Sequence, residues 1–132
     1  MKVIALLLLI VLAMADNCGG NCPSGKCPNC PCGTTKYLID IATWCAKYNG
    51  WNQVCCKCIV SHSSGGNAYA LNYNTNNSLD VGVWQINSSL WSICSNGHAP
   101  CDATSNLNCA IEMYLMGGNS FKMWAMHTAC GC

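Results

Sequence analysis

The chain contains no arginine, and only 8% of its 132 residues are charged, with six Lys against five Asp and Glu. Recognition of phosphate depends on clustered Lys and Arg, so this scarcity of cations excludes a nucleic-acid-binding protein. It also excludes electrostatic attachment to an anionic membrane surface. The hydrophobic share of 52% is too high for a disordered tail. Length and composition together indicate one small folded domain.

The first fifteen residues have the pattern of a secretory signal peptide. A positive start at Lys2 precedes the unbroken apolar run 3–13, and residues 13–15 read Ala-Met-Ala, a small-x-small cleavage site. The alternative is a membrane anchor, but this run is too short to cross about 30 Å of hydrocarbon. We therefore expect residues 1–15 to be removed. The mature protein would be secreted, into the medium or the lumen of a vacuole or phagosome, with no membrane attachment.

All fourteen cysteines follow this segment. Cysteines pair in an oxidising compartment, so we expect up to seven disulfides, whose connectivity the spacing alone does not give. Five cysteines lie in the Gly- and Pro-rich stretch 18–33, which we interpret as part of a Cys-rich cap over residues 16–34. Cys27, Cys30 and Cys32 could instead bind a metal or form a redox pair. No His lies nearby, so disulfides are favoured, and we expect neither a metal nor another cofactor.

The remaining segment, 35–132, is predicted to be one α+β domain, mainly helical with a small antiparallel hairpin. Helical periodicity covers three segments: 35–47, 52–62 and 106–116. Their inner faces are expected to include, in that order, Leu38, Val54 and Leu115. Turn-forming Asn and Ser, with strand residues Val81, Val83 and Ile86, predict a hairpin within 67–87.

One stretch of the sequence resembles a known superfamily. Residues 58–87 read CIVSHSSGGNAYALNYNTNNSLDVGVWQIN, a helix end followed by a hairpin and the motif D-x-G-x-x-Q-I-N. This stretch resembles the core of chicken-type lysozymes and of the related soluble lytic transglycosylase domains. The matching residues are Ser64, Asn72, Asn74, Ser78, Asp80, Gly82, Gln85, Ile86 and Asn87, with Asn108, Cys109, Ala110 and Trp124 further along. The resemblance implies a lysozyme-like fold over about residues 35–130. It also implies a disulfide between Cys58 and a C-terminal cysteine, expected to be Cys130, and another between Cys109 and either Cys94 or Cys101.

The catalytic position departs from these families. Hydrolysis of a glycosidic bond normally needs a carboxylic acid to protonate the leaving oxygen and a second carboxylate beside it. By the resemblance the second carboxylate is Asp80, but Ser63 occupies the place of the acidic Glu. A hydroxyl is a far weaker acid, and general acid catalysis is worth about 10²–10⁴-fold. Neither of the other candidates is expected to substitute. His62 is rotated by about 100° along a helix, and Glu112 is expected to be solvated.

The resemblance also implies a sugar-binding cleft. Gln85, Asn87 and Trp124 would surround the pocket for an N-acetyl group, Asn74 would lie on the hairpin side, and Trp91 would be a cleft tryptophan. Each aromatic residue has a structural alternative in core packing. Asp80 has one too, because a carboxylate in a hairpin can simply satisfy turn amides.

Together these observations predict a secreted, lysozyme-like monomer that binds β-1,4-linked N-acetylhexosamine polysaccharide, such as bacterial peptidoglycan or a chitin-type glycan, with weak or lost cleavage. One alternative is an active cell-wall hydrolase or transglycosylase that uses an acid we have not identified. Another is a non-catalytic interaction protein that no longer binds sugars.

Overall fold

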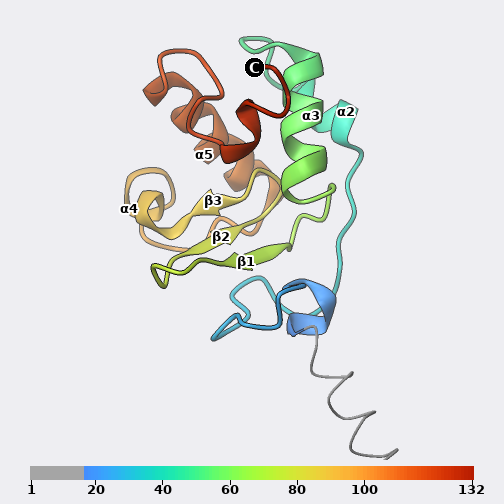
Figure 1. Ribbon diagram of the computed structural model, residues 1–132, viewed down its shortest axis with the longest axis vertical. Coiled ribbons are helices and arrows are strands. Elements are labelled where there is room, and N and C mark those ends of the chain that lie inside the picture. The colour runs from blue at the N-terminus through green and yellow to red at the C-terminus, as the bar shows by residue number, and fades with distance from the viewer. Residues whose placement is uncertain (1–16) are drawn as a thin grey trace, which may run out of the picture.

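The computed structural model describes residues 17–132, so the predicted signal peptide lies outside the described residues. The protein is an α+β fold with a small antiparallel sheet, as expected (Figure 1). No helix within residues 17–132 is long and apolar enough to cross a membrane. Seven disulfides link all fourteen cysteines, and this indicates an oxidising compartment.

Two helices dominate the upper half of the molecule in Figure 1. Helix α3 (Gln53–Ser63) begins where the Asn52 side chain accepts the N–H of Cys55, and it confirms the predicted helix 52–62. Helix α5 (Ala103–Met116) starts three residues earlier than predicted, because Asp102 caps it by accepting the N–H of Ser105. The short helix α4 (Trp91–Cys94) and the 3₁₀ turns η1 (Cys18–Gly20), η2 (Ser88–Leu90) and η3 (Ala125–His127) complete the helical elements.

The predicted helix 35–47 is wrong over its first half. Only Ile41–Cys45 is helical (α2), whereas the chain before Asp40 is extended and bridges Asn67 through Leu38. Three residues expected on inner faces also lie outside the core: Leu38 is 72% exposed, Val54 70% and Leu115 52%. The buried face of α3 consists of Ile59, which was predicted to point inward, together with Cys56 and Val60.

Three short strands form the sheet in the order β1-β2-β3, with each pair antiparallel. They are β1 (Leu71–Tyr73), β2 (Leu79–Val81) and β3 (Ile86–Asn87). Val83, predicted as a strand residue, lies in the β2–β3 turn. Gly82 and Gln85 have positive φ there (84° and 52°), which breaks the extended backbone.

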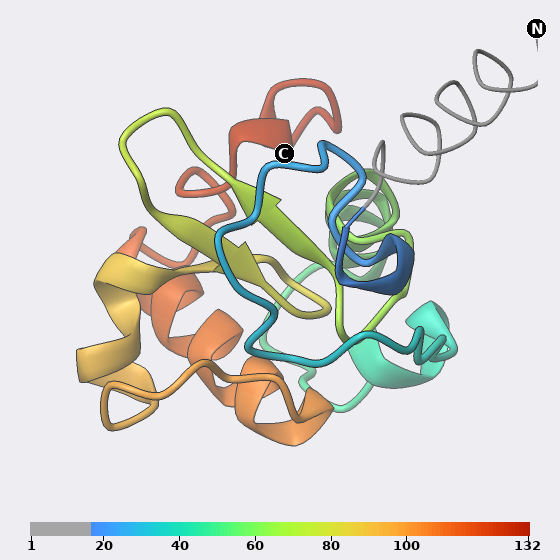
Figure 2. The ribbon, with the colours of Figure 1, turned by 90° about the horizontal axis from the view of Figure 1, so that it is seen from below.

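Two hydrophobic clusters hold these elements together. The larger joins α3 and α5 through aromatic side chains that pack at tilted angles, including Trp51, Trp84 and Phe121. The smaller joins the cap cysteines to Leu71, Leu79 and Val81 of the sheet. In Figures 1 and 2 the sheet therefore lies between the helices on one side and the cap on the other.

The disulfides confirm both implied pairings. Cys58 pairs with Cys130, and Cys109 pairs with Cys94 rather than Cys101. Cys101 instead pairs with Cys32, which ties the cap to the loop before α5. The other cap bridges are Cys18–Cys30 and Cys22–Cys27, and the remaining bridges are Cys45–Cys56 and Cys55–Cys132.

Candidate functional site

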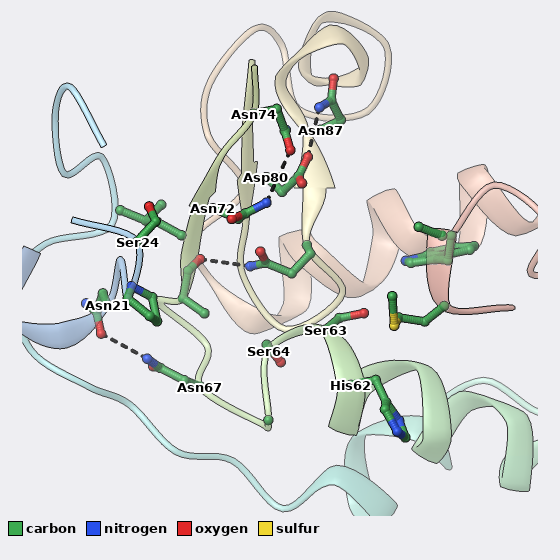
Figure 3. A pocket seen from close by; sticks show the side chains of 18 of the residues that line it. Asn21, Ser24, His62, Ser63, Ser64, Asn67, Asn72, Asn74, Asp80 and Asn87 are labelled. Atoms are coloured by element: carbon green, nitrogen blue, oxygen red, sulfur yellow. Dashed lines mark hydrogen bonds between the residues drawn. The ribbon is translucent and has the colours of Figure 1, made fainter. Parts of the chain in front are cut away.

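A large open cleft of about 1030 Å³ lies between the C-terminal end of α3, the sheet, the cap and the segment that leads into η3 (Figure 3). Its lining contains six of the seven predicted site residues: Ser63, Asn74, Asp80, Gln85, Asn87 and Trp124. The seventh, Trp91, is not among the residues that line it. Segments far apart in the sequence thus meet around one cavity.

The sheet register sets the polar floor of the cleft. Asp80 of β2 pairs with Asn72 of β1 on one side and with Asn87 of β3 on the other. Cross-strand partners share one face of a sheet, so these three side chains form a row toward the cleft. The neighbouring row, Leu71, Val81 and Ile86, is buried on the opposite face.

Hydrogen bonds hold this row in place. The Asn87 Nδ2 donates to Asp80 Oδ1 at 2.8 Å and to Ser78 Oγ at 2.9 Å, while its Oδ1 accepts the N–H of Ser89 at 3.1 Å. Asn74 Nδ2 donates to the same Ser78 hydroxyl at 3.0 Å. Most hydrogen-bonding groups of the Asn74 and Asn87 side chains are therefore used within the sheet. Asp80 accepts one of these hydrogen bonds, which is the structural role given above as the alternative to a catalytic one.

Ser63 is the last residue of α3, and its half-buried side chain points into the cleft (Figure 3). The next residue fixes this helix end. Ser64 Oγ donates to the carbonyl of Val83 at 2.7 Å and accepts the N–H of Gly66 at 3.1 Å. Because Ser64 ties α3 to the β2–β3 turn, the position of Ser63 relative to the sheet is defined.

The acidic groups near Ser63 are few. Asp80 is the only carboxylate among the described residues that line the cleft. Glu112 is exposed on α5, as predicted, and lies outside the lining. His62 reaches the rim of the cleft, but its Nδ1 lies 2.9 Å from the carbonyl of Cys58 and its ring is turned back along α3, away from Ser63 (Figure 3).

Gln85 is held by the turn that carries it. Its Nε2 donates to the carbonyls of Ala70 and Gly82, both at 3.0 Å, which joins the start of β1 to the β2–β3 turn. Beneath this turn lies the fully buried Asn106 of α5. Its Oδ1 accepts the N–H of Trp84 at 2.8 Å. Asn106 was not predicted from the sequence, because an Asn on an otherwise apolar helix face gives no periodic signal.

Trp124 is both core and cleft wall. It is only 4% exposed, its Nε1 donates to the carbonyl of Trp84 at 2.8 Å, and its edge lines the cleft. Three methionines line the cleft with it: Met113, Met123 and Met126. This apolar wall is a second feature that the sequence analysis missed.

Trp91 corrects the expectation of a second cleft tryptophan. Its Nε1 donates to the carbonyl of Ile86 at 3.1 Å, and its ring packs against both hydrophobic clusters. The structural alternative therefore describes Trp91 better than the binding role.

One group of side chains in the described part of the chain has metal-ligating atoms close together. The ligand atoms of Cys58, His62 and Cys130 all lie within 4.8 Å of one another. The two cysteines form a disulfide, and metals bind the thiolate form, so this group offers no Cys₂His set in the oxidised protein.

The cap forms one end of the cleft through Asn21, Pro23 and Ser24, and the extended segment that follows adds Lys36 and Leu38. Neither contribution follows from the sequence motif, which begins only at residue 58. No protein-family model matches the chain.

Proposed function

We propose that this chain is a secreted, lysozyme-like protein that binds β-1,4-linked N-acetylhexosamine polysaccharide and has weak or lost cleavage activity. The observation that carries the proposal is the meeting of Ser63 and Asp80 in one cleft with Gln85, Asn87 and Trp124. These residues were selected from the sequence resemblance alone, and they come from a helix end, two strands, a turn and a C-terminal segment.

The chemistry of the cleft supports a sugar ligand. A hexosamine ring has a rim of hydroxyl and amide groups and flatter C–H faces. The cleft offers the same division, with the row Asn72, Asp80 and Asn87 on one side and Trp124 beside Met123 on the other. The volume of about 1030 Å³ is at the upper end for small-ligand pockets, which favours several linked sugars over one.

The residues of the same cleft argue for weak or lost cleavage activity. Asp80 is the only carboxylate lining it among the described residues, and it accepts a hydrogen bond from Asn87. Ser63 cannot supply the proton that the leaving oxygen needs, and His62 is turned away. Binding contacts are separate from the proton donor, so they survive its replacement.

The experiment restores the missing acid. Wild-type protein and Ser63→Glu are compared for binding of chitotetraose by calorimetry, for co-sedimentation with insoluble bacterial cell wall, and for release of reducing ends from that cell wall. We expect both proteins to bind, and Ser63→Glu to cleave about 10²–10⁴-fold faster, since this is the worth of a general acid.

Two controls sharpen this test. Ser61→Glu places a carboxylate two residues earlier on α3, at an exposed position outside the cleft lining, and should give no gain. Ser63→Glu combined with Asp80→Asn should lose the gain. No binding by wild type to either glycan would overturn the proposed function. Binding without any gain in Ser63→Glu would overturn only the account of the missing acid, and wild-type cleavage equal to Ser63→Glu would favour the active-enzyme alternative.

A further inference from the structure

The cap is a fixed wall of the cleft. Asn21 is 1% exposed, and its Nδ2 donates to the carbonyls of Gly33 at 3.1 Å and Thr35 at 3.0 Å. Its Oδ1 accepts from Asn67 Nδ2 at 2.9 Å, just after the helix end that carries Ser63 (Figure 3). The Cys32–Cys101 disulfide adds a covalent tie. The cap and the end of the cleft that contains Ser63 therefore form one rigid surface.

The segment after the cap presents Lys36 to this surface. Two hydrogen bonds of the Tyr37 backbone fix the segment in an extended form: its N–H donates to the side-chain Oδ1 of Asn67 at 3.1 Å, and its C=O accepts from Ala68 N–H at 2.7 Å. Side chains alternate along an extended chain. Lys36 and Leu38 consequently line the cleft, while Tyr37 lines a separate cavity of about 320 Å³ on the other side.

The stem of Lys36 lies across Gly20 of the cap. A Cβ built on Gly20 would lie 3.4 Å from Lys36 Cε, so the side chain rests on the cap backbone at this point. In Figure 2 the chain that joins the cap to α2 runs across the sheet. The Nζ would lie 3.9 Å from the same built Cβ, so the end of this side chain, with its ammonium group, lies where the cap borders the cleft.

The charges of the cleft are unevenly placed. Lys36 is the only Lys lining it among residues 17–132, and Asp80, the only carboxylate, already accepts from Asn87 on the sheet. Two apolar side chains, Pro23 and Leu38, line the cleft together with Lys36, and Leu38 is 72% exposed. A cation next to small apolar surfaces fits a carboxylate attached to a short aliphatic group.

We infer that the cap-side end of the cleft binds a carboxylate-bearing substituent of the glycan through Lys36, with Leu38 and Pro23 contacting its aliphatic part. The inference rests on the proposed function and narrows it. It selects the bacterial cell-wall strand, whose muramic acid carries a lactyl carboxylate or an acidic stem peptide, over neutral chitin.

The test compares four soluble tetrasaccharides by calorimetry. The first is the alternating N-acetylglucosamine–N-acetylmuramic acid tetrasaccharide with free lactyl carboxylates, and the second is the same tetrasaccharide with these carboxylates converted to methyl amides. The third carries on its lactyl groups an L-Ala-D-isoGln-type dipeptide with a free carboxyl terminus. The fourth is chitotetraose. An exposed ion pair is worth up to about 1 kcal/mol, so wild type should prefer a charged form to the neutral amide by about two- to fivefold. The preference should disappear in about 0.5 M salt, because screening then acts within a few ångströms. The first and third compounds distinguish a lactyl carboxylate from a peptide carboxylate.

Lys36→Gln should abolish the preference, whereas Lys26→Gln should keep it. Lys26→Gln is the matched control, since Lys26 is exposed on the cap but lies outside the cleft lining. Equal binding of charged and amidated forms by wild type would overturn the inference and leave the proposed function standing. So would a preference that survives in Lys36→Gln. Failure of wild type to bind any of the four would overturn both.

Discussion

Asn106 offers a quantitative test of how α5 supports the sheet. Its side chain is fully buried, and its Nδ2 donates to the carbonyls of Val81 at 2.9 Å and Pro100 at 2.7 Å. Its Oδ1 accepts the N–H of Trp84 at 2.8 Å. One side chain thus satisfies three backbone groups that water does not reach.

Replacing Asn106 by Ala leaves all three groups unpaired. Each buried polar group without a partner costs about 1–3 kcal/mol, so the free energy of unfolding should fall by roughly 3–5 kcal/mol, with some recovery if water enters the space. Asn108→Ala removes the same side chain from the exposed face of the same helix. Its effect should stay within about 0.5 kcal/mol.

Guanidinium denaturation of the oxidised proteins, followed by circular dichroism and tryptophan fluorescence, measures these differences. Asn106→Asp keeps the volume but loses the donor, and it should be destabilised nearly as much as the alanine variant. The reasoning is refuted if Asn106→Ala costs less than about 1 kcal/mol, or no more than Asn108→Ala.

Two further predictions concern backbone and capping. Gly82→Ala should unfold more easily than Gly97→Ala. Both glycines have positive φ (84° and 81°), but only at Gly82 would the new Cβ meet another atom, because it would lie 2.0 Å from Asn106 Nδ2. Urea midpoints compare the pair, and equal values would contradict the steric account. Hydrogen bonds from the Thr43 hydroxyl and N–H lower the pKa of Asp40 from 3.8, so its contribution to stability is present above that pH and lost as the pH falls through the lowered pKa. Asp40→Asn, which still caps α2, should reduce the acid sensitivity of unfolding between pH 6 and 2, and an unchanged profile would argue against it.

The helices that sequence periodicity predicted best are those with both an apolar face and a local cap. α3 follows Asn52 and α5 follows Asp102, and each is long enough for the period to show. The helix predicted at 35–47 failed because its first half is held extended by hydrogen bonds to the Asn67 side chain and the Ala68 backbone, about thirty residues away, which no local pattern reports.

The candidate site was also predicted only in part. The motif around Asp80 and Gln85 identified residues that do share a cleft, because the spacing of a short hairpin constrains where its side chains lie. The apolar wall and the contribution of Lys36 were not predictable, since both depend on long-range packing. Trp91 shows that the sequence does not distinguish an aromatic residue packed against a core from one that lines a cleft.

The disulfide pattern also decides what a protease can do to this chain. The rings closed by Cys32–Cys101 and Cys55–Cys132 overlap, so every peptide bond from residue 32 to residue 132 lies within a covalent circuit. One endoproteolytic cut there leaves both products attached until a reductant acts. The ring closed by Cys18–Cys30 is separate, and between residues 18 and 132 the two systems are connected only through Pro31. Within residues 18–132, a single cut therefore separates the products only at the two peptide bonds of Pro31, whose ring holds its φ fixed.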